Sequence, residues 1–277
     1  MAVALILVLV AVGSVVFHLF SPWWWTPIAS NWGYVDNTLI ITFWITGTVF
    51  VAVLLFTAYC VLRFRHREGQ QALYEPENKR LEWGLTIATA LGVAAMLAPG
   101  LYVWHQFVTV PADATEVEIV GRQWSWSYRL PGKDGRLGTS NVSNISTDNP
   151  LGLNANDPNA QDDVVIESDN LHLQIGKPIK FLLRSLDVLH NFYVPEFRGK
   201  MDMIPGAVTY YWVTPTRPGT FDILCFELCG VGHPQMRGQV VVEEDGAHQV
   251  WLEKQKTFAE VSGQPKTLKA DYVPASK

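Results

Sequence analysis

The sequence has few charged residues. Only 17% of its 277 residues are Asp, Glu, Lys or Arg, against about 25% in typical soluble domains. Hydrophobic residues make up 48%, and a chain with this much apolar surface must bury it, which excludes disorder as the dominant state. The mean hydropathy of +0.11 is high for a soluble protein but too low for a chain that lies wholly in a membrane. Most of the apolar excess precedes residue 110, and most of the acidic residues follow it.

Cysteine and basic residues are also scarce. The three cysteines, Cys60, Cys225 and Cys229, are too few for a disulfide scaffold. The formal net charge of -5 excludes the strongly basic character that a nucleic-acid-binding protein needs. The negative net charge instead suits binding to a basic protein partner.

Three long apolar segments predict a membrane anchor in residues 1–110. They cover residues 2–20, 38–62 and 83–106, and each has the length of about 20 residues that a helix needs to cross a hydrocarbon core. Backbone amides in lipid must be paired within the segment, so we expect helices. The first segment lacks the basic start and the small-residue cleavage site of a signal peptide, which favours a retained helix over a cleaved leader. The anchor therefore has two or three transmembrane helices.

The loop between the second and third apolar segments is basic. Its Lys and Arg residues are Arg63, Arg65, Arg67, Lys79 and Arg80. Because positive loops stay on the cytoplasmic side, the chain after residue 110 is expected on the extracytoplasmic side. Trp32 and Tyr34, with residues 22–25, would then form an aromatic belt at the outer interface.

Residues 111–260 are expected to form an all-β domain. Short runs that alternate apolar and polar residues, such as 116–120, are typical of strands exposed on one face, and Gly and Pro turn signals separate them. Several short strands at this spacing predict an antiparallel sandwich or barrel. Residues 131–163 are rich in Gly, Asn, Asp and Ser and predict a long surface insertion rather than core. A short amphipathic helix is expected after Gly246, and residues 261–277 form a C-terminal tail.

One loop gathers soft metal ligands. Residues 225–236 read Cys-Phe-Glu-Leu-Cys-Gly-Val-Gly-His-Pro-Gln-Met and contain two thiols, an imidazole and a thioether. A second imidazole, that of His190, follows a different predicted strand. Loops on a β-scaffold bring such groups together from distant sequence positions. Thiolate and thioether ligands select copper(I), zinc or iron–sulfur clusters.

Four interpretations of these residues stay open. A structural zinc site uses two Cys and two His and leaves Met236 without a role. A mononuclear blue-copper site uses one Cys, so one thiol is left over. Cys225 and Cys229 could instead pair as a disulfide in an oxidising compartment. Two thiolates can also bridge two coppers with one imidazole at each, and we favour this interpretation because it uses all five side chains: His190, Cys225, Cys229, His233 and Met236.

The two ligand segments resemble those of subunit II of the haem-copper oxidases, which carries the binuclear CuA centre of cytochrome c oxidase. In that family the loop reads Cys-x-Glu-x-Cys-Gly-x-x-His-x-x-Met, which residues 225–236 match throughout, and residues 187–195 match the upstream Asp-Val-x-His segment. The resemblance covers most of the chain and implies a cupredoxin-like sandwich. It implies magnesium binding by the Glu227 side chain at the contact with subunit I. The copper ligands that it implies are His190, Cys225, the main chain of Glu227, Cys229, His233 and Met236.

The resemblance also assigns roles to three residues outside the copper loop. Trp124 would receive the electron from cytochrome c, although aromatic residues that alternate on a strand are more often core or interface packing. Asp187 would help to dock the lysine ring of the cytochrome. Glu82, at the start of the third apolar segment, would stand at the mouth of a proton-uptake route, whereas its local sequence also suits an acid that stabilises a helix N-terminus.

The function that the resemblance implies is that of an electron-accepting subunit of a respiratory terminal oxidase in the bacterial inner membrane. Electrons from cytochrome c would pass through CuA to haem in subunit I, which reduces oxygen to water, and no catalytic residue is expected in this chain. Two alternatives stay open: the CuA-bearing subunit of a nitric-oxide reductase, and a membrane-tethered electron carrier without a catalytic partner. Ser125, Ala207 and the extra segment 2–20 depart from the usual family pattern and indicate a divergent bacterial branch.

Overall fold

The computed structural model describes residues 1–21, 26–71, 74–167 and 170–262. The chain forms two compact units: residues 1–26 with 34–105, and residues 27–33 with the chain from Gln106 onward. The predicted boundary at residue 110 differs from this division mainly in residues 27–33. The predicted aromatic residues 22–25 and nearly all of the predicted tail lie outside the described residues.

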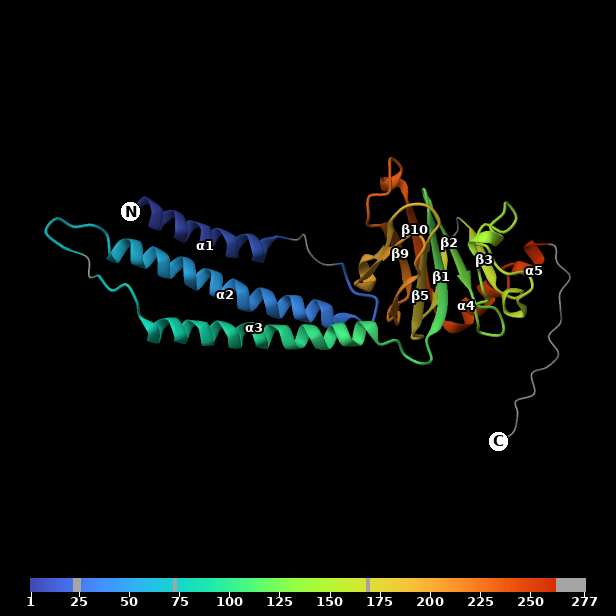
Figure 1. Ribbon diagram of the computed structural model, residues 1–277, viewed down its shortest axis with the longest axis horizontal. Helices are drawn as coiled ribbons and strands as arrows, with labels where there is room; N and C mark the ends of the chain where they lie inside the picture. Colours follow the sequence, from blue (N-terminus) through green and yellow to red (C-terminus); the bar gives the residue numbers. More distant parts are fainter. Residues whose placement is uncertain (22–25, 72–73, 168–169, 263–277) are drawn as a thin grey trace, which may run out of the picture. The chain divides into compact units, whose positions relative to one another are not determined.

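Three long helices make up the first unit (Figure 1): α1 (Ala2–Phe20), α2 (Gly33–Arg63) and α3 (Lys79–Val108). All three are long and apolar enough to cross a membrane, as the sequence predicts. Helices α2 and α3 extend beyond the apolar segments because the helical hydrogen bonding continues into their polar ends. At the start of α3, the backbone N–H of Leu81 donates to Asn78 Oδ1 at 3.1 Å and that of Asn78 donates to Glu82 Oε1 at 3.3 Å, which is a reciprocal cap.

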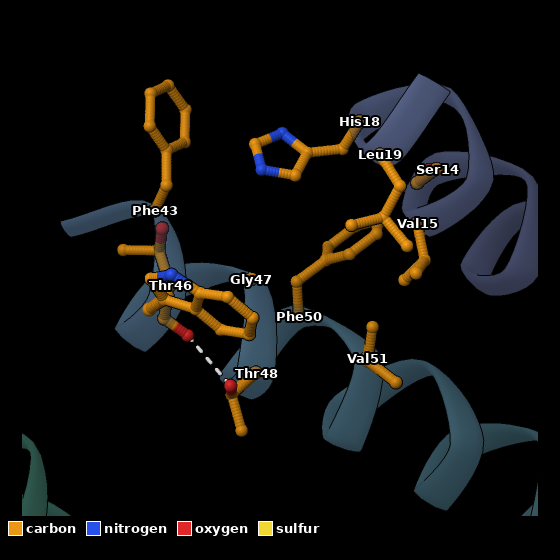
Figure 2. A pocket seen from close by; sticks show the side chains of 11 residues that line it. Ser14, Val15, His18, Leu19, Phe43, Thr46, Gly47, Thr48, Phe50 and Val51 are labelled. Carbon is orange, nitrogen blue, oxygen red and sulfur yellow. Dashed lines mark hydrogen bonds between the residues drawn. The ribbon is translucent and has the colours of Figure 1, made fainter. Parts of the chain in front are cut away.

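Helices α1 and α2 approach each other through small residues. Ala4 and Ala11 of α1 are buried, as is Ala58 of α2, and small side chains allow two helices in lipid to pack closely. Toward the end of α1, a cavity of about 640 Å³ opens between the two helices. Figure 2 shows His18 extending from α1 into this space toward α2, where Phe43 and Phe50 also line it.

The second unit is a sandwich of two sheets with five strands each, as expected for a cupredoxin-like domain. In one sheet the strand order is β3–β2–β1–β5–β8, and in the other it is β4–β10–β9–β6–β7. Pairs β1–β5 and β4–β10 are parallel, so both sheets are mixed where the sequence predicted antiparallel pairing. The strands are β1 (Thr115–Arg122), β2 (Ser125–Leu130), β3 (Val164–Glu167), β4 (Leu171–Gln174), β5 (Ile179–Ser185), β6 (His190–Val194), β7 (Gly199–Met203), β8 (Thr209–Val213), β9 (Gly219–Cys225) and β10 (Arg237–Glu243).

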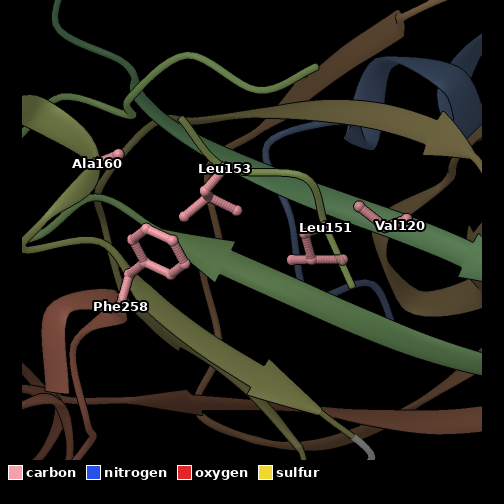
Figure 3. Close-up of a cluster of buried hydrophobic side chains, with 5 residues drawn as sticks. All are labelled: Val120, Leu151, Leu153, Ala160 and Phe258. Atoms are coloured by element: carbon pink, nitrogen blue, oxygen red, sulfur yellow. The ribbon is translucent and has the colours of Figure 1, made fainter. Parts of the chain in front are cut away.

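Residues 131–163 contribute to the core of the second unit. Figure 3 shows Leu151, Leu153 and Ala160 gathered with Val120 of β1 and Phe258 of α5 (Phe258–Val261), and all five side chains are buried. The prediction that this segment lies outside the core is therefore wrong for its few apolar residues. They cover a part of β1 that would otherwise face water. Helix α4 (Asp245–Leu252) follows β10, close to the position predicted for a helix.

A buried ion-pair network links the segment 131–163 to the sheet. Arg129 of β2 lies 2.8 Å from both Glu118 Oε2 and Asp163 Oδ2, and Arg184 lies 3.3 Å from Glu118 Oε1. The backbone N–H of Gly138 also donates to Asp163 Oδ2. Burial raises the pKa of Asp163 to about 7 in spite of the neighbouring Arg129, and its Oδ1 has no hydrogen-bond partner.

Trp32 belongs to the second unit rather than to an interfacial belt. Its indole N–H donates to the carbonyl oxygen of Trp212 at 2.8 Å, and its ring makes an edge contact with the ring of Trp212. The prediction of an interfacial position is therefore wrong for Trp32, which is buried, while Tyr34 is exposed. The reason is that residues 27–33 pair with the sandwich, for example through Asn31 and the backbone of Thr214.

Candidate metal centre

Strand pairing brings the two predicted ligand segments together at one end of the sandwich. Cys225 is the last residue of β9, and the loop that follows it returns the chain to β10. Strand β6 pairs with β9, with Phe192 opposite Cys225. His190, at the start of β6, therefore lies beside Cys225 although the two are 35 residues apart in sequence.

Each of the two thiols has an imidazole nitrogen as a close neighbour. Cys225 Sγ and Cys229 Sγ are 3.7 Å apart. His190 Nδ1 is 3.8 Å from Cys225 Sγ, and His233 Nδ1 is 3.6 Å from Cys229 Sγ. Met236 Sδ lies 3.8 Å from Cys229 Sγ. The structure thus brings together all five side chains that the sequence nominated.

A backbone carbonyl completes the group of donor atoms. The carbonyl oxygen of Glu227 is 3.2 Å from Cys225 Sγ, the position expected for a main-chain ligand. Both thiols are free, and their separation is far from the S–S bond length of about 2.05 Å. The cluster therefore offers two thiols, two imidazoles, a thioether and a carbonyl oxygen around one small volume.

Four of the five donor side chains are buried and that of His233 is half-buried, and the two thiols differ in acidity. Burial raises the pKa of Cys225, but hydrogen bonds with His190 and with the backbone of Glu227 and Asn191 outweigh burial and lower it to about 6. Burial and the neighbouring Cys225 sulfur raise the pKa of Cys229 to about 11. Because a soft cation binds thiolates rather than thiols, metal binding would favour loss of the protons of both thiols.

Asp187 holds His190 in place. Its Oδ1 accepts the Nε2–H of His190 at 2.8 Å, which leaves Nδ1 facing the thiols. Its carboxylate also accepts the backbone N–H groups of Gln123 and Val188 at 2.6 and 2.7 Å. Burial raises the pKa of Asp187, but these hydrogen bonds outweigh burial and lower it overall. The carboxylate that the sequence nominated for docking thus holds the ligand His190 while its side chain stays 30% exposed, and its role in docking stays a prediction.

Trp124 lies between the surface and the ligand loop. Its side chain is 40% exposed, and its indole N–H donates to the carbonyl oxygen of Cys229 at 3.2 Å. A Cβ atom added at Gly232 would lie 2.3 Å from the indole ring, so only glycine allows this close approach. The exposed ring is therefore in direct contact with the loop that carries four of the candidate ligands.

Gln123 is a residue that the sequence did not nominate. Its side-chain amide donates to the same carbonyl oxygen of Cys229 at 2.8 Å, which anchors the ligand loop to the β1–β2 turn. No spacing pattern marks a glutamine for this role. For the contact of Trp124 with this loop, Gly230 and Gly232 could have served as a signal, because a glycine often marks the close approach of another group to the backbone.

Glu82 is separate from the cluster, because it lies in α3 in the first unit. Its carboxylate accepts the backbone N–H of Asn78. This contact is the one expected of an acid at a helix N-terminus. The role of Glu82 in proton uptake stays a prediction, as does magnesium binding by the side chain of Glu227.

Comparison with known proteins gives a consistent result. The family model of the cytochrome c oxidase subunit II periplasmic domain matches residues 115–244. The alternative cytochrome c oxidase subunit 2 of Bradyrhizobium diazoefficiens is 70% identical over 272 residues, which cover 98% of this chain and 98% of that protein. Cytochrome c oxidase subunit 2 of Cereibacter sphaeroides is 25% identical over 237 residues, covering 83% of this chain and 77% of that protein.

A solved structure is also similar, that of the periplasmic domain of subunit II of cytochrome oxidase from Bradyrhizobium japonicum. It has 27% sequence identity and a TM-score of 0.39, and the match covers 52% of this chain and 95% of that one. The near-complete match to the first relative confirms the resemblance, including the divergent bacterial branch. The helical anchor and the matched periplasmic domain describe a membrane-anchored oxidoreductase subunit. The chain belongs to the cytochrome c oxidase subunit II family.

Proposed function

We propose that this chain accepts electrons one at a time from cytochrome c at Trp124 and delivers them, by way of a CuA centre, to haem in subunit I. The observation that carries the proposal is the convergence of two thiols and two imidazoles. The two sulfurs are 3.7 Å apart, and each has an imidazole nitrogen within 4 Å. This donor set suits two metals that share the thiolates between them.

The donor set fits copper better than zinc. Structural zinc is bound by four ligands, whereas six donor atoms converge here, including the sulfur of Met236 and the carbonyl oxygen of Glu227. A methionine thioether is a known ligand of protein copper sites, whereas structural zinc sites use Cys and His. When bound, a two-copper centre supplies a site that takes up one electron shared between the metals, with little change in geometry at either.

The residues of this chain hold the donors in place through hydrogen bonds. Asp187 fixes the ring of His190, and Gln123 and Trp124 fix the backbone of the ligand loop at Cys229. A rigid donor set lowers the structural rearrangement that accompanies a change of charge. Trp124 presents an exposed aromatic ring at hydrogen-bond distance from this backbone, which supports its role as the point where the electron is received.

Oxygen is favoured over nitric oxide as the final acceptor. The relative with 70% identity is an alternative cytochrome c oxidase subunit 2, and its match extends through the whole chain rather than the copper loop alone. We therefore place this subunit in a terminal oxidase of the bacterial inner membrane, beside subunit I and further integral subunits. At the contact with subunit I, the carboxylate of Glu227 would bind magnesium.

Metal analysis of the full chain tests the proposal. The chain is purified in detergent without its partner subunits, loaded with copper and freed of excess metal. We expect two coppers per polypeptide. Cys229→Ser should leave at most one copper, and Cys60→Ser, a matched change in α2, should leave two. One copper per wild-type chain, or a stable preference for zinc, would contradict the proposal.

A further inference from the structure

The ring of His190 is held by packing as well as by its hydrogen bond. The side chain is fully buried. Asp187 accepts its Nε2–H at 2.8 Å, and Nδ1 lies 3.8 Å from Cys225 Sγ. One hydrogen bond at one atom of the ring does not fix the tilt of the ring plane. The other contacts of the imidazole therefore determine how well Nδ1 keeps its direction.

The backbone of Gly121 in β1 approaches this ring from the other sheet. A Cβ atom added at Gly121 would lie 3.2 Å from Cδ2 and 3.4 Å from Cγ of His190, and 3.4 Å from the terminal methyl group of Met203. Cδ2 lies across the imidazole from Nδ1, so the contact is on the side of the ring away from the thiols. The glycine leaves a space there that the methyl group of Met203 reaches.

Met203 of β7 is the neighbour of His190 within its own sheet. The register of β6 and β7 places the two residues directly opposite each other, and side chains in such antiparallel pairs lie on the same face with Cβ atoms about 4.5–5.5 Å apart. Met203 is fully buried. Because methionine is unbranched and has three rotatable bonds, it fills irregular gaps well, such as the one that Gly121 leaves beside the ring.

Trp126 of β2 lies on a further side of the ring. It pairs with Gly121 across β1 and β2, and its buried indole contacts the imidazole of His190 edge to face, with centroids 6.4 Å apart and an angle of 62° between the rings. The imidazole is thus enclosed by Gly121, Trp126 and Met203, with Asp187 at Nε2. Of these partners, Met203 alone belongs to β7.

We propose that Met203 is a positioning residue of the metal centre. Its side chain fills the space between His190 and Gly121 and so keeps Nδ1 directed toward the thiols. The inference rests on the proposed function and adds a residue of β7 to the groups that hold the centre. The role depends on the volume and apolar character of the side chain and not on its sulfur as a ligand.

The physical basis is the sensitivity of metal affinity to the orientation of a ligand. Contacts outside the ligand set orient the ligands, and the loss of one typically costs about 10- to 100-fold in metal affinity. Truncation of Met203 would leave a void beside the ring, because a packed interior relaxes only partly around a deleted group. The imidazole of His190 could then tilt into the void while its hydrogen bond to Asp187 is kept.

Copper affinity of the full chain tests the inference. The chain is purified in detergent, loaded with copper and titrated with a copper chelator. We expect Met203→Ala to bind copper about tenfold or more weakly than wild type. Met203→Leu, which conserves volume without the sulfur, should stay within about threefold of wild type.

Leu173→Ala is the matched control for a void elsewhere in the core. Leu173 is buried in β4 and pairs with Val242, at the end of β10 far from the ligand loop. Both alanine variants should lower the unfolding temperature of the metal-free chain, but Leu173→Ala should keep wild-type copper affinity. A merely structural role of Met203 would therefore give two variants with the same affinity for copper.

Three outcomes would overturn the inference. One is a Met203→Ala chain that binds copper as well as the Leu173→Ala chain, and another is a Met203→Leu chain as weak as Met203→Ala, which would assign the role to the sulfur. If Met203→Ala fails to fold, Met203→Val leaves a smaller void and should still bind copper more weakly than wild type. Wild-type affinity in that valine variant is the third.

Failure of the proposed function is seen in a different sample. It would show in the wild-type chain, as fewer than two coppers per polypeptide or a preference for zinc. The comparison of the Met203 variants would then be made with the metal that the wild-type chain retains. His190 belongs to the donor set for either metal, so the same ranking of the variants is expected, and equal affinities would still overturn the role of Met203.

Discussion

At the scale of single residues, neighbours that are not themselves metal ligands determine how the ligands are held. Asp187 directs Nδ1 of His190 toward the thiols, and Gln123 ties the loop at Cys229 to the neighbouring turn. Such outer partners tune metal affinity because they fix the orientation and basicity of the ligands. The ligands were recognisable from their chemistry and spacing, whereas these partners become recognisable only when the loops are seen together.

Asp187→Asn should weaken copper binding by about 10- to 100-fold. The amide keeps the shape of the side chain but removes the negative charge that accepts the Nε2–H of His190. Competition with a copper chelator measures the change in affinity of the full chain. Asp222→Asn, at an exposed aspartate of β9 whose nearest cation is 4.0 Å away, serves as the control. Equal affinities in the two variants would contradict the positioning role of Asp187.

Gly232→Ala should displace Trp124 from the ligand loop. The added Cβ would lie 2.3 Å from the ring, and overpacking of this kind typically costs about 1–3 kcal/mol of stability. We expect a lower unfolding temperature and slower electron acceptance in the assembled oxidase. Gly246→Ala, where the added Cβ meets nothing within 4 Å, should leave both unchanged. A Gly232→Ala variant with wild-type stability and kinetics would show that the close contact is dispensable.

At the scale of elements, alternation predicted β1, β3, β4, β5, β8, β9 and β10 to within a few residues. In most of these strands buried residues alternate with more exposed ones. Strand β1 is buried on both faces, against the prediction of one exposed face, because Glu118 is paired with Arg129 inside the protein.

Strands β6 and β7 were not predicted from alternation of apolar and polar residues. In β6 the polar residues His190 and Asn191 are buried on account of their bonds to Asp187 and Asp202, so polarity no longer reports exposure. Tertiary partners, which a single sequence does not reveal, decide such positions.

The segment 131–163 shows a second limit of sequence pattern. Many of its polar residues form hydrogen bonds with nearby backbone. The side-chain amide of Asn149, for example, donates to the carbonyl oxygen of Leu153 and accepts its backbone N–H. The side chains of Leu151 and Leu153 can then enter the core. Composition predicted the turns correctly. It could not show that two leucines within a polar loop have an apolar face of β1 to cover.

Burial of Asp163 should make stability depend on pH. Its pKa is raised from 3.8 to about 7, so between these values the folded chain binds more protons than the unfolded chain. This contribution to stability is fully present below about pH 4 and is lost as pH rises through 7. The slope reaches at most about 1.4 kcal/mol per pH unit.

Comparison with Asp163→Asn isolates this effect. Unfolding is followed from pH 5 to pH 8 in detergent for the wild-type and variant chains, and the wild-type chain should lose more stability over this range. The difference between the two curves removes the contributions of all other groups. Parallel curves would show that Asp163 keeps an ordinary pKa beside Arg129.

At the scale of the whole molecule, the distribution of charge sets the orientation in the membrane. The basic loop between α2 and α3 should be cytoplasmic and the sandwich periplasmic. Cysteines introduced at Gln70 and at the exposed Val142 test this with a membrane-impermeant thiol reagent, against the wild-type chain as background. Intact spheroplasts should label only the Val142→Cys chain, and inverted vesicles only the Gln70→Cys chain. The reverse pattern would contradict the orientation.

The central claim is that the cluster at His190, Cys225, Cys229, His233 and Met236 holds two coppers that share one unpaired electron. Electron paramagnetic resonance of the copper-loaded full chain tests it most directly, because each copper nucleus splits the signal of an electron that it carries. An electron shared equally by two copper nuclei gives seven hyperfine lines, and this is the pattern we predict. A four-line pattern, which one copper produces, would contradict the account.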